Sequence, residues 1–353
     1  MMTRHMPLSF RPALLLARLP LPILCLALSA SMLLFPRLAT AEPAVEEPFG
    51  IALEGFAYPY PVEFLPLTLY GEALRMAHMD VTPAGEPNGR AVLLLHGRNF
   101  PSSYWQGTIQ ALSEAGYRVI APDQIGFNKS SKPSFDLHLD ELARNTAALL
   151  DALGIDKVSL VGHSMGGMLS VRFARAHPGR VDKIVLVAPI GLEDYRLYVP
   201  DLPPDKLMAI EEKVTAESYL NQLMKGYSLT LSEEAVTPYV ATRTRIKESA
   251  EYPRWLRVFV NSALMIWREP VAHEIPLLPQ DVLFVMGEND HLAPGRDFAP
   301  EAVRNEMGQN VKLARELAAR MKQARVEMFE GIGHLPHLEA SERFQETVLR
   351  FLE

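Results

Sequence analysis

The stretch Lys157-Val-Ser-Leu-Val-Gly-His-Ser-Met-Gly-Gly167 joins an aliphatic run to a serine flanked by glycines. Residues 157–161 have the β-branched and apolar character of a buried parallel strand, and Gly162 to Gly166 satisfies the G-x-S-x-G pattern. We expect a helix at 164–176 to follow. A serine hydroxyl is a weak nucleophile that needs a tight, solvent-reachable turn beside a base. The stretch therefore indicates Ser164 as a nucleophile, although ordinary glycine-rich turns share the pattern.

Aliphatic strands alternate with helical segments on both sides of this turn. Such alternation predicts an α/β fold with a mostly parallel, doubly wound sheet covered by helices on both faces. The first two strands flank Gly71 and predict a hairpin at a sheet edge. The expected strands are 62–70, 73–81, 91–95, 117–121, 157–161, 181–187, 281–286 and 325–329. The expected helices are 103–115, 138–153, 164–176, 311–324 and 337–352.

The alternation stops in the middle of the chain. Residues 191–275 contain no aliphatic strand but three helix-like stretches, 204–225, 232–248 and 252–267. We interpret this segment as a helical lid between two parts of one core, 62–190 and 276–353, preceded by an extended arm at 42–61. About three of its large side chains are expected to touch substrate, and the others to form its own core. The candidates are Tyr195, Tyr198, Tyr219, Met224, Tyr227, Trp255, Met265 and Trp267.

The first 41 residues have the pattern of a secretory signal peptide. Three arginines, the last of them Arg18, precede the apolar run Ile23 to Phe35, and Ala39-Thr-Ala41 offers a small-residue cleavage site. We expect cleavage after Ala41 and a secreted or periplasmic protein. The apolar run is short for a bilayer span, so an uncleaved anchor is the less favoured alternative. Cys25, the only cysteine, follows a leucine where a lipoprotein signal needs a small residue.

The charge balance disfavours nucleic acid and anionic membrane surfaces as partners. The chain has 35 basic and 42 acidic residues, and four arginines lie in the first 41 residues, so residues 42–353 carry 35 − 4 = 31 basic against 42 acidic groups, a net charge of −11. The histidines other than His334 show no ligand-like spacing, so neither a metal nor a cofactor is expected. Without cysteine, the mature chain has neither disulfide nor thiolate.

Three polar residues, Ser164, Asp290 and His334, each follow a predicted strand. The carboxyl ends of parallel strands share one edge of a sheet, so these side chains are expected to converge there. In such a triad the histidine accepts the serine proton and the acid orients the imidazole.

Each of these residues has rivals. His337 is a second candidate base, but Pro336 and the following helix favour a surface or capping role. Three other acids, Glu288, Glu193 and Asp194, lie after neighbouring strands. We expect His96, Asp123 and His163 to hold loop backbone by hydrogen bonds. The Arg98 side chain either contacts substrate or, as favoured here, is solvated.

Five segments fall in an order that resembles the α/β-hydrolase fold of the lidded type. They are His96-Gly97, Pro122-Asp123 with Gly126 and Ser130, Gly162 to Gly167, Gly287 to Asp290, and Gly333-His334. The resemblance covers about residues 62–190 and 276–353, nearly the whole mature chain. It implies a serine hydrolase whose oxyanion is held by the backbone N–H groups of Met165 and Arg98.

The segment 122–133 is similar to epoxide hydrolases and haloalkane dehalogenases, but those relatives use an aspartate where this chain has Ser164. The serine at this position makes the chain more similar to the esterases, lactonases, C–C hydrolases and peptidases of the same family. The favoured function is cleavage of a carboxylic ester with a hydrophobic part through an acyl-enzyme. Alternatives are a lactone, an amide or a C–C bond on the same triad, or a non-catalytic receptor that uses the lid to hold its ligand.

Overall fold

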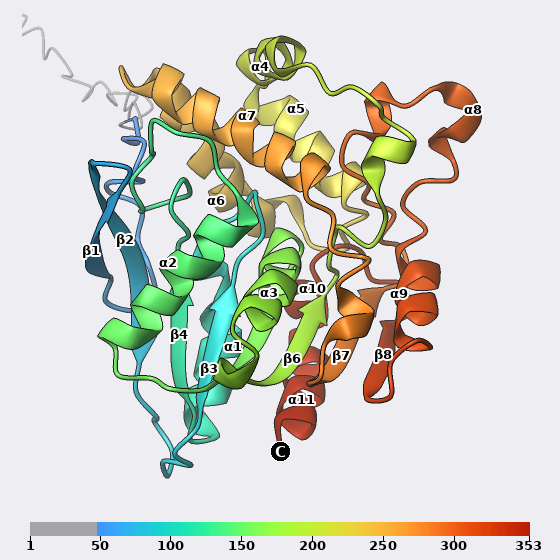
Figure 1. The fold of residues 1–353 in the computed structure, drawn as a ribbon. Helices are drawn as coiled ribbons and strands as arrows, with labels where there is room; N and C mark the ends of the chain where they lie inside the picture. Colours follow the sequence, from blue (N-terminus) through green and yellow to red (C-terminus); the bar gives the residue numbers. More distant parts are fainter. Residues whose placement is uncertain (1–47) are drawn as a thin grey trace, which may run out of the picture. The chain divides into compact units, whose positions relative to one another are not determined.

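A computed structural model describes residues 48–353 (Figure 1). They form one eight-stranded sheet in the order β1-β2-β4-β3-β5-β6-β7-β8. Only the pairs β1–β2 and β2–β4 are antiparallel. The strands are β1 (Glu63–Leu69), β2 (Glu72–Val81), β3 (Ala91–Leu95), β4 (Arg118–Pro122), β5 (Val158–His163), β6 (Val181–Val187), β7 (Asp281–Gly287) and β8 (Ala324–Phe329). The predicted mostly parallel, doubly wound sheet is therefore confirmed.

The two faces of the sheet bury different side chains of the same strands. In β3, Leu93 and Leu95 belong to one hydrophobic core, and Val92 and Leu94 belong to another. The same alternation continues in β6 and β7. Successive side chains of a strand point to opposite faces, so an uninterrupted aliphatic strand needs a helical layer on each side.

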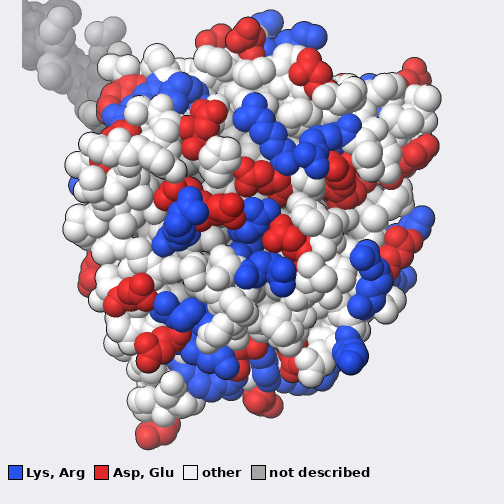
Figure 2. Space-filling model, in the orientation of Figure 1, with Lys and Arg blue, Asp and Glu red and all other residues white. Residues whose placement is uncertain are grey.

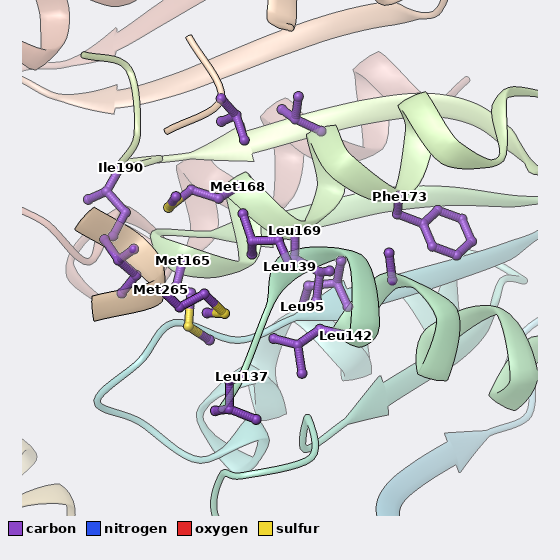
Figure 3. Packing of buried hydrophobic residues seen from close by; sticks show 14 of the residues in the cluster. Leu95, Leu137, Leu139, Leu142, Met165, Met168, Leu169, Phe173, Ile190 and Met265 are labelled. Atoms are coloured by element: carbon purple, nitrogen blue, oxygen red, sulfur yellow. The ribbon is translucent and has the colours of Figure 1, made fainter. Parts of the chain in front are cut away.

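Helices supply both layers. The first core includes side chains of α2 (Leu139–Ala152), α3 (Met165–Ala176) and α9 (Asn310–Ala318). The second includes side chains of α1 (Gln106–Glu114) and α11 (Ser341–Leu352). Figure 3 shows Met165, Met168 and Leu169 of α3 within the first core, near Met265 and Ile190.

Between β6 and β7 the chain is helical, and Figure 1 shows these helices beyond one end of the sheet. They are α4 (Pro204–Glu212), α5 (Ala216–Asn221), α6 (Glu233–Thr244) and α7 (Tyr252–Arg268). The single helix predicted at 204–225 is wrong, because the Thr215 side chain accepts a hydrogen bond from the backbone of Ser218 and starts α5 as a separate helix. A π-helical turn, Gln222–Gly226, follows.

Two other predictions need correction. The helix predicted at 337–352 consists of α10 (Pro336–Glu339) and α11, separated at Ala340, whose ψ of 54° is not helical. Residues 291–310, for which no helix or strand is expected from the sequence, contain a short 3₁₀ turn and α8 (Glu301–Arg304). The predicted signal peptide lies outside the described residues, and so do the first six residues of the arm.

Lysine and arginine alternate with aspartate and glutamate over the face shown in Figure 2. Of the helices at 48–353, none is both long and apolar enough to cross a membrane.

Candidate active site

The loops after β5, β7 and β8 bring Ser164, Asp290 and His334 into contact. His334 Nε2 lies 3.0 Å from Ser164 Oγ, and His334 Nδ1 lies 2.9 Å from Asp290 Oδ2. His334 and Asp290 are at most 1% exposed and Ser164 is 5% exposed. The carboxylate can only accept, so Nδ1 carries the proton and Nε2 is free to take one from Ser164. The arrangement has the geometry of a nucleophile, a base and an orienting acid.

Ser164 occupies a strained backbone conformation at the start of α3. Its φ of 55° and ψ of −117° lie in a region that costs a non-glycine residue about 1–3 kcal/mol. A Cβ on Gly166 would overlap the carbonyl oxygen of Leu95, and one on Gly162 would overlap the carbonyl of Gly166. Glycine at both positions therefore lets α3 pack tightly against the strands while Ser164 points out of the turn.

Backbone groups hold the acid in place. Asp290 Oδ1 accepts a hydrogen bond from the backbone of Leu292 (3.0 Å), and Asn310 Nδ2 donates to the carbonyl oxygen of Leu292 (3.0 Å) and to that of Asp290 (3.3 Å). The helix α9 thus braces the loop that carries Asp290. Asn310 was not predicted, because an asparagine at the start of a helix carries no signal for this role.

The three rival acids have other partners. Glu193 Oε1 accepts from the backbone of Gly308 (2.9 Å), and burial raises the pKa of its carboxyl group. Asp194 pairs with Arg196, and Glu288 accepts from the backbone of Gly331.

A chain of buried hydrogen bonds joins the loop after β3 to His334. His163 Nε2 lies 2.8 Å from the carbonyl oxygen of His334, and its Nδ1 lies 3.0 Å from the hydroxyl of Tyr104, which accepts from the backbone of Gly97 (2.9 Å). A carbonyl only accepts, so His163 carries its proton on Nε2 and accepts from Tyr104 on Nδ1. Burial, and then the neighbouring His337 and His334, hold the pKa of His163 well below its ordinary value.

The expected structural roles of the other motif residues agree with their contacts. His96 Nε2 accepts from the backbone of Gln124 (3.0 Å), so its Nδ1 donates to the carbonyl of Gly97 (2.7 Å). Asp123 accepts from the backbone of Ser102 and from the hydroxyl of Tyr58 in the N-terminal arm. Both motifs therefore fix loops beside the strand ends.

The surface role expected of His337 is wrong. Its side chain is 2% exposed, and its ring packs 4.4 Å from Trp105 and 4.7 Å from Tyr104, centroid to centroid. Neither of its ring nitrogens has a hydrogen-bond partner within residues 48–353. Burial, with the adjacent His334, lowers the pKa of His337 to about 3. His337 is thus a neutral residue of the core and does not contact Ser164 in the way His334 does.

A cavity of about 300 Å³ opens beside Ser164. Aliphatic side chains form a large part of its wall, which comes mainly from the β6–β7 insertion and the loop after β7. Of the eight large side chains proposed from the sequence, only Tyr227 lines this cavity. Most of the others are in the cores, for example Tyr219 and Met265. The aliphatic lining residues are Ile190, Leu202, Leu207, Ile210, Val214, Val260, Ile266 and Leu292.

One part of the cavity wall is charged, which the sequence did not reveal. Arg98, Glu211 and Arg243 all line it. The solvated side chain expected for Arg98 is wrong, because Arg98 Nε donates to Ser262 (2.8 Å) and Nη2 to the carbonyl of Phe259 (2.7 Å) in α7. The charged wall depends on contacts between distant segments, and no local pattern signals it.

Metal-ligand geometry is absent from the described part of the chain: no group of three or more His, Cys, Asp or Glu side chains there is arranged to hold an ion.

Comparisons with known proteins agree with this geometry. The family model for the alpha/beta hydrolase fold matches residues 90–341. The 2-hydroxy-6-oxo-6-phenylhexa-2,4-dienoate hydrolase of Burkholderia cepacia is 30% identical over 81% of this chain and 95% of its own. A probable hydrolytic enzyme from Pseudomonas aeruginosa superposes with a TM-score of 0.83 at 38% identity, covering 87% of this chain and 99% of the other.

An esterase from Thermogutta terrifontis shares the fold, with a TM-score of 0.61 at 22% identity over 82% of this chain and 98% of its own. The match to the family model spans well over half of the sequence. The chain therefore belongs to the α/β-hydrolase-fold family and is a hydrolase of that family.

Proposed function

We propose that this protein cleaves a carboxylic ester through an acyl-enzyme on Ser164. The observation that carries the proposal is the pair of hydrogen bonds that His334 makes, 3.0 Å to Ser164 and 2.9 Å to Asp290. Nucleophile, base and acid are thus assembled before substrate arrives, on loops that buried hydrogen bonds hold in place.

The reaction proceeds in two halves. Ser164 Oγ attacks the ester carbonyl carbon while its proton passes to His334 Nε2, and the alcohol then leaves with that proton. Water next attacks the acyl carbon, gives a proton to His334, and the carboxylic acid departs as Ser164 regains its hydrogen. Asp290 stays ionised and stabilises the imidazolium in both halves.

The oxyanion of each tetrahedral intermediate would accept hydrogen bonds from the backbone N–H groups of Met165 and Arg98. Met165 is the first residue of α3, where an N–H has no partner within the helix and the helix dipole favours negative charge. The carbonyl of Gly97 is held by His96, and the N–H of Gly97 is held by Tyr104, which orients the peptide that leads to Arg98. Each such donor contributes roughly 3 kcal/mol to transition-state stabilisation.

The insertion at 191–275 would act as a lid over this site. Its helices supply a large part of the cavity wall beside Ser164, and the aliphatic side chains of that wall suit the hydrophobic part of a small ester. The backbone carbonyl of Tyr227 also accepts a hydrogen bond from the N–H of His334 (2.9 Å), so the insertion contacts the loop that carries the base.

The test is hydrolysis of a p-nitrophenyl ester series from acetate to long acyl chains, with Ser164→Ala as control. We expect turnover by the wild type and none by the variant. If the wild type hydrolyses no ester while a fluorophosphonate probe still labels its Ser164, the nucleophile is reactive and the natural substrate contains another kind of bond. If the probe also fails, a receptor that only binds its ligand replaces the enzyme.

A second candidate is cleavage of a C–C bond next to a carbonyl. It is favoured by the relative from Burkholderia cepacia, whose name states that it hydrolyses 2-hydroxy-6-oxo-6-phenylhexa-2,4-dienoate. Incubation with that compound, followed by chromatography of the products, separates the two candidates. A C–C hydrolase would consume it faster than any p-nitrophenyl ester.

We also propose that residues 1–41 direct secretion and are removed. The support is the order of arginines, apolar run and Ala39-Thr-Ala41 in the sequence. Mass spectrometry of protein recovered from periplasm or medium should give Glu42 as the first residue. An intact N-terminus in a membrane fraction would indicate an anchor instead.

A further inference from the structure

Three ionic side chains from separate segments meet on the wall of the Ser164 cavity. Arg98 follows β3, Glu211 lies in α4 and Arg243 lies in α6; we name these three residues the arginine cluster. Both carboxylate oxygens of Glu211 are occupied by Arg243, through Nε at 2.7 Å and through Nη2. Glu211 therefore neutralises Arg243, and within residues 48–353 Arg98 makes no hydrogen bond to Glu211.

Within residues 48–353, the Arg98 side chain donates hydrogen bonds only to neutral groups. Its Nε and Nη2 donate to Ser262 and to the Phe259 carbonyl, and its guanidinium carbon lies 3.6 Å from the centre of the Phe259 ring. The guanidinium carbon of Arg243 lies 4.7 Å from the same ring. Burial and the nearby charge of Arg243 lower the pKa of Arg98 to about 10, which still leaves it protonated at neutral pH.

The cluster thus carries two positive charges and one negative charge beside the cavity. The remaining ionic groups that line it, Arg296 and Asp297, are one of each sign and do not change this balance. An unpaired charge is costly to bury unless a counter-charge or solvent reaches it. The charge excess therefore marks a place where an anion would be stabilised.

Two residues of the same wall have unused hydrogen-bonding atoms. Arg243 is 6% exposed, and its Nη1 has no hydrogen-bond partner within residues 48–353. Asn99 also lines the cavity, and its Oδ1 is likewise buried and unpaired there. Buried polar atoms without a partner are rare in folded proteins and often mark a position that a ligand or water fills. The unused Arg243 donor and the excess charge of Arg98 lie on one wall.

We propose that the arginine cluster binds a carboxylate of the substrate, which makes the substrate a half-ester whose free carboxylate lies remote from the scissile carbonyl. The inference rests on the proposed ester hydrolysis at Ser164. It changes the substrate class expected from the sequence, from a wholly hydrophobic ester to one with an apolar middle and an anionic end. The aliphatic wall contacts the middle, and the guanidinium groups contact the end.

The first measurement compares matched esters on the wild type. Mono-4-nitrophenyl esters of adipic, suberic and sebacic acid are each paired with the same compound bearing a methyl ester in place of the free carboxylate. We expect kcat/KM for the best half-ester to exceed that of its neutral match by about tenfold, the typical value of a charge-assisted hydrogen bond. A preference for the neutral compound at every length would overturn the proposal.

The second measurement compares two arginine variants. Arg98→Gln removes the excess charge, and the ratio of half-ester to neutral-ester kcat/KM should fall about tenfold. Arg254→Gln is the matched control, because Arg254 also ties α7 to the core, through the Lys132 carbonyl and Glu72, and does not line the cavity. It should keep the wild-type ratio. If Arg98→Gln lowers both rates alike, Arg98 is only a structural tie.

Arg98→Lys keeps a positive charge at this position and serves if the glutamine variant does not fold. In Arg98→Lys the ratio of half-ester to neutral-ester kcat/KM should fall less than kcat/KM itself. Equal loss in both substrates would count against a charge-specific role.

A binding experiment separates this inference from the proposed function. Calorimetry of Ser164→Ala with free suberate should show binding that is lost in Ser164→Ala/Arg98→Gln. If the wild type cleaves no ester but this binding is seen, the ester function fails and the carboxylate site stands. If esters are cleaved without any carboxylate preference or binding, the site fails and the ester function stands.

Discussion

The two walls of the cavity differ in how completely their polar groups are paired. On the sheet side, Ser164, His334 and Asp290 are joined to one another and to backbone groups by hydrogen bonds. On the wall formed with the insertion, where Arg98 of the loop after β3 contacts α7, Arg98 has no carboxylate partner within residues 48–353 and Arg243 keeps an unused donor. The difference teaches that the three triad side chains are paired without a ligand, whereas the insertion wall leaves a buried donor and an excess charge that a bound anion would pair. We therefore expect chemistry to depend on the first wall and substrate choice on the second.

The largest effect expected on the sheet side is that of Asp290→Asn. The amide cannot hold His334 in the tautomer that leaves Nε2 free, so kcat should fall about 10³- to 10⁴-fold with the fold intact. Circular dichroism and ester turnover check this. Asp194→Asn is the surface control and should behave as wild type.

A kcat of Asp290→Asn close to that of the wild type would contradict this expectation, because catalysis on the sheet side would then not depend on Asp290. Turnover of Glu193→Gln and Glu288→Gln would show which carboxylate takes its place.

Packing gives the second test, with one glycine from each side. Gly166→Ala forces a Cβ into the carbonyl of Leu95 and should lower the free energy of unfolding by about 3 kcal/mol or more. Gly226→Ala, in the insertion, meets nothing closer than Gln222 Cγ at 3.9 Å and should be neutral or slightly stabilising. Urea unfolding of both variants measures the contrast. Equal free energies of unfolding for the two variants would mean that the turn around Ser164 can relax to accept the added Cβ.

Acid should destabilise the sheet side through its buried histidines. The pKa of His337 falls from 6.5 to about 3 in the folded protein, so the unfolded chain binds more protons between these values. Stability is therefore full above pH 6.5 and is lost on acidification, by ~1.4 kcal/mol per pH unit for this residue. His337→Phe should flatten the slope of unfolding free energy against pH.

His273→Asn is the control for that slope, because the His273 side chain is 74% exposed. It should leave the pH dependence unchanged. If the pH dependence of the unfolding free energy persists in His337→Phe, other groups cause it. His163, whose pKa is also lowered, is the first of these to test.

The smallest effect expected is that of Tyr104→Phe. The loss of the hydroxyl leaves the N–H of Gly97 and Nδ1 of His163 without their partners. We expect kcat to fall about tenfold with little change in KM, because Tyr104 holds the loop proposed to bind the oxyanion and does not line the cavity. Tyr117→Phe is the control. Tyr117 directly precedes β4 and its hydroxyl accepts a hydrogen bond from Arg90, so loss of this hydroxyl should not change kcat. A change in KM alone would place Tyr104 in substrate binding.

The candidate site could be predicted from the sequence to the extent that local pattern specifies it. Ser164 stands out because it lies in a glycine-bounded turn directly after an aliphatic strand, and Asp290 and His334 because each follows a strand of the same sheet. Their convergence follows from parallel strands having their carboxyl ends at one edge. The catalytic roles of the three remain predictions until the variants are measured.

The sequence by itself determined the sheet, its two helical layers and the three residues at its edge, because strand alternation and turn chemistry are short-range properties of the chain. Only the tertiary structure decided the burial of His337, the bracing of Asp290 by Asn310 and the charged cavity wall. Arg98, Glu211 and Arg243 are far apart in sequence and look like ordinary surface charges there. Whether a charge faces solvent or a cavity depends on long-range packing, and no local pattern encodes that packing.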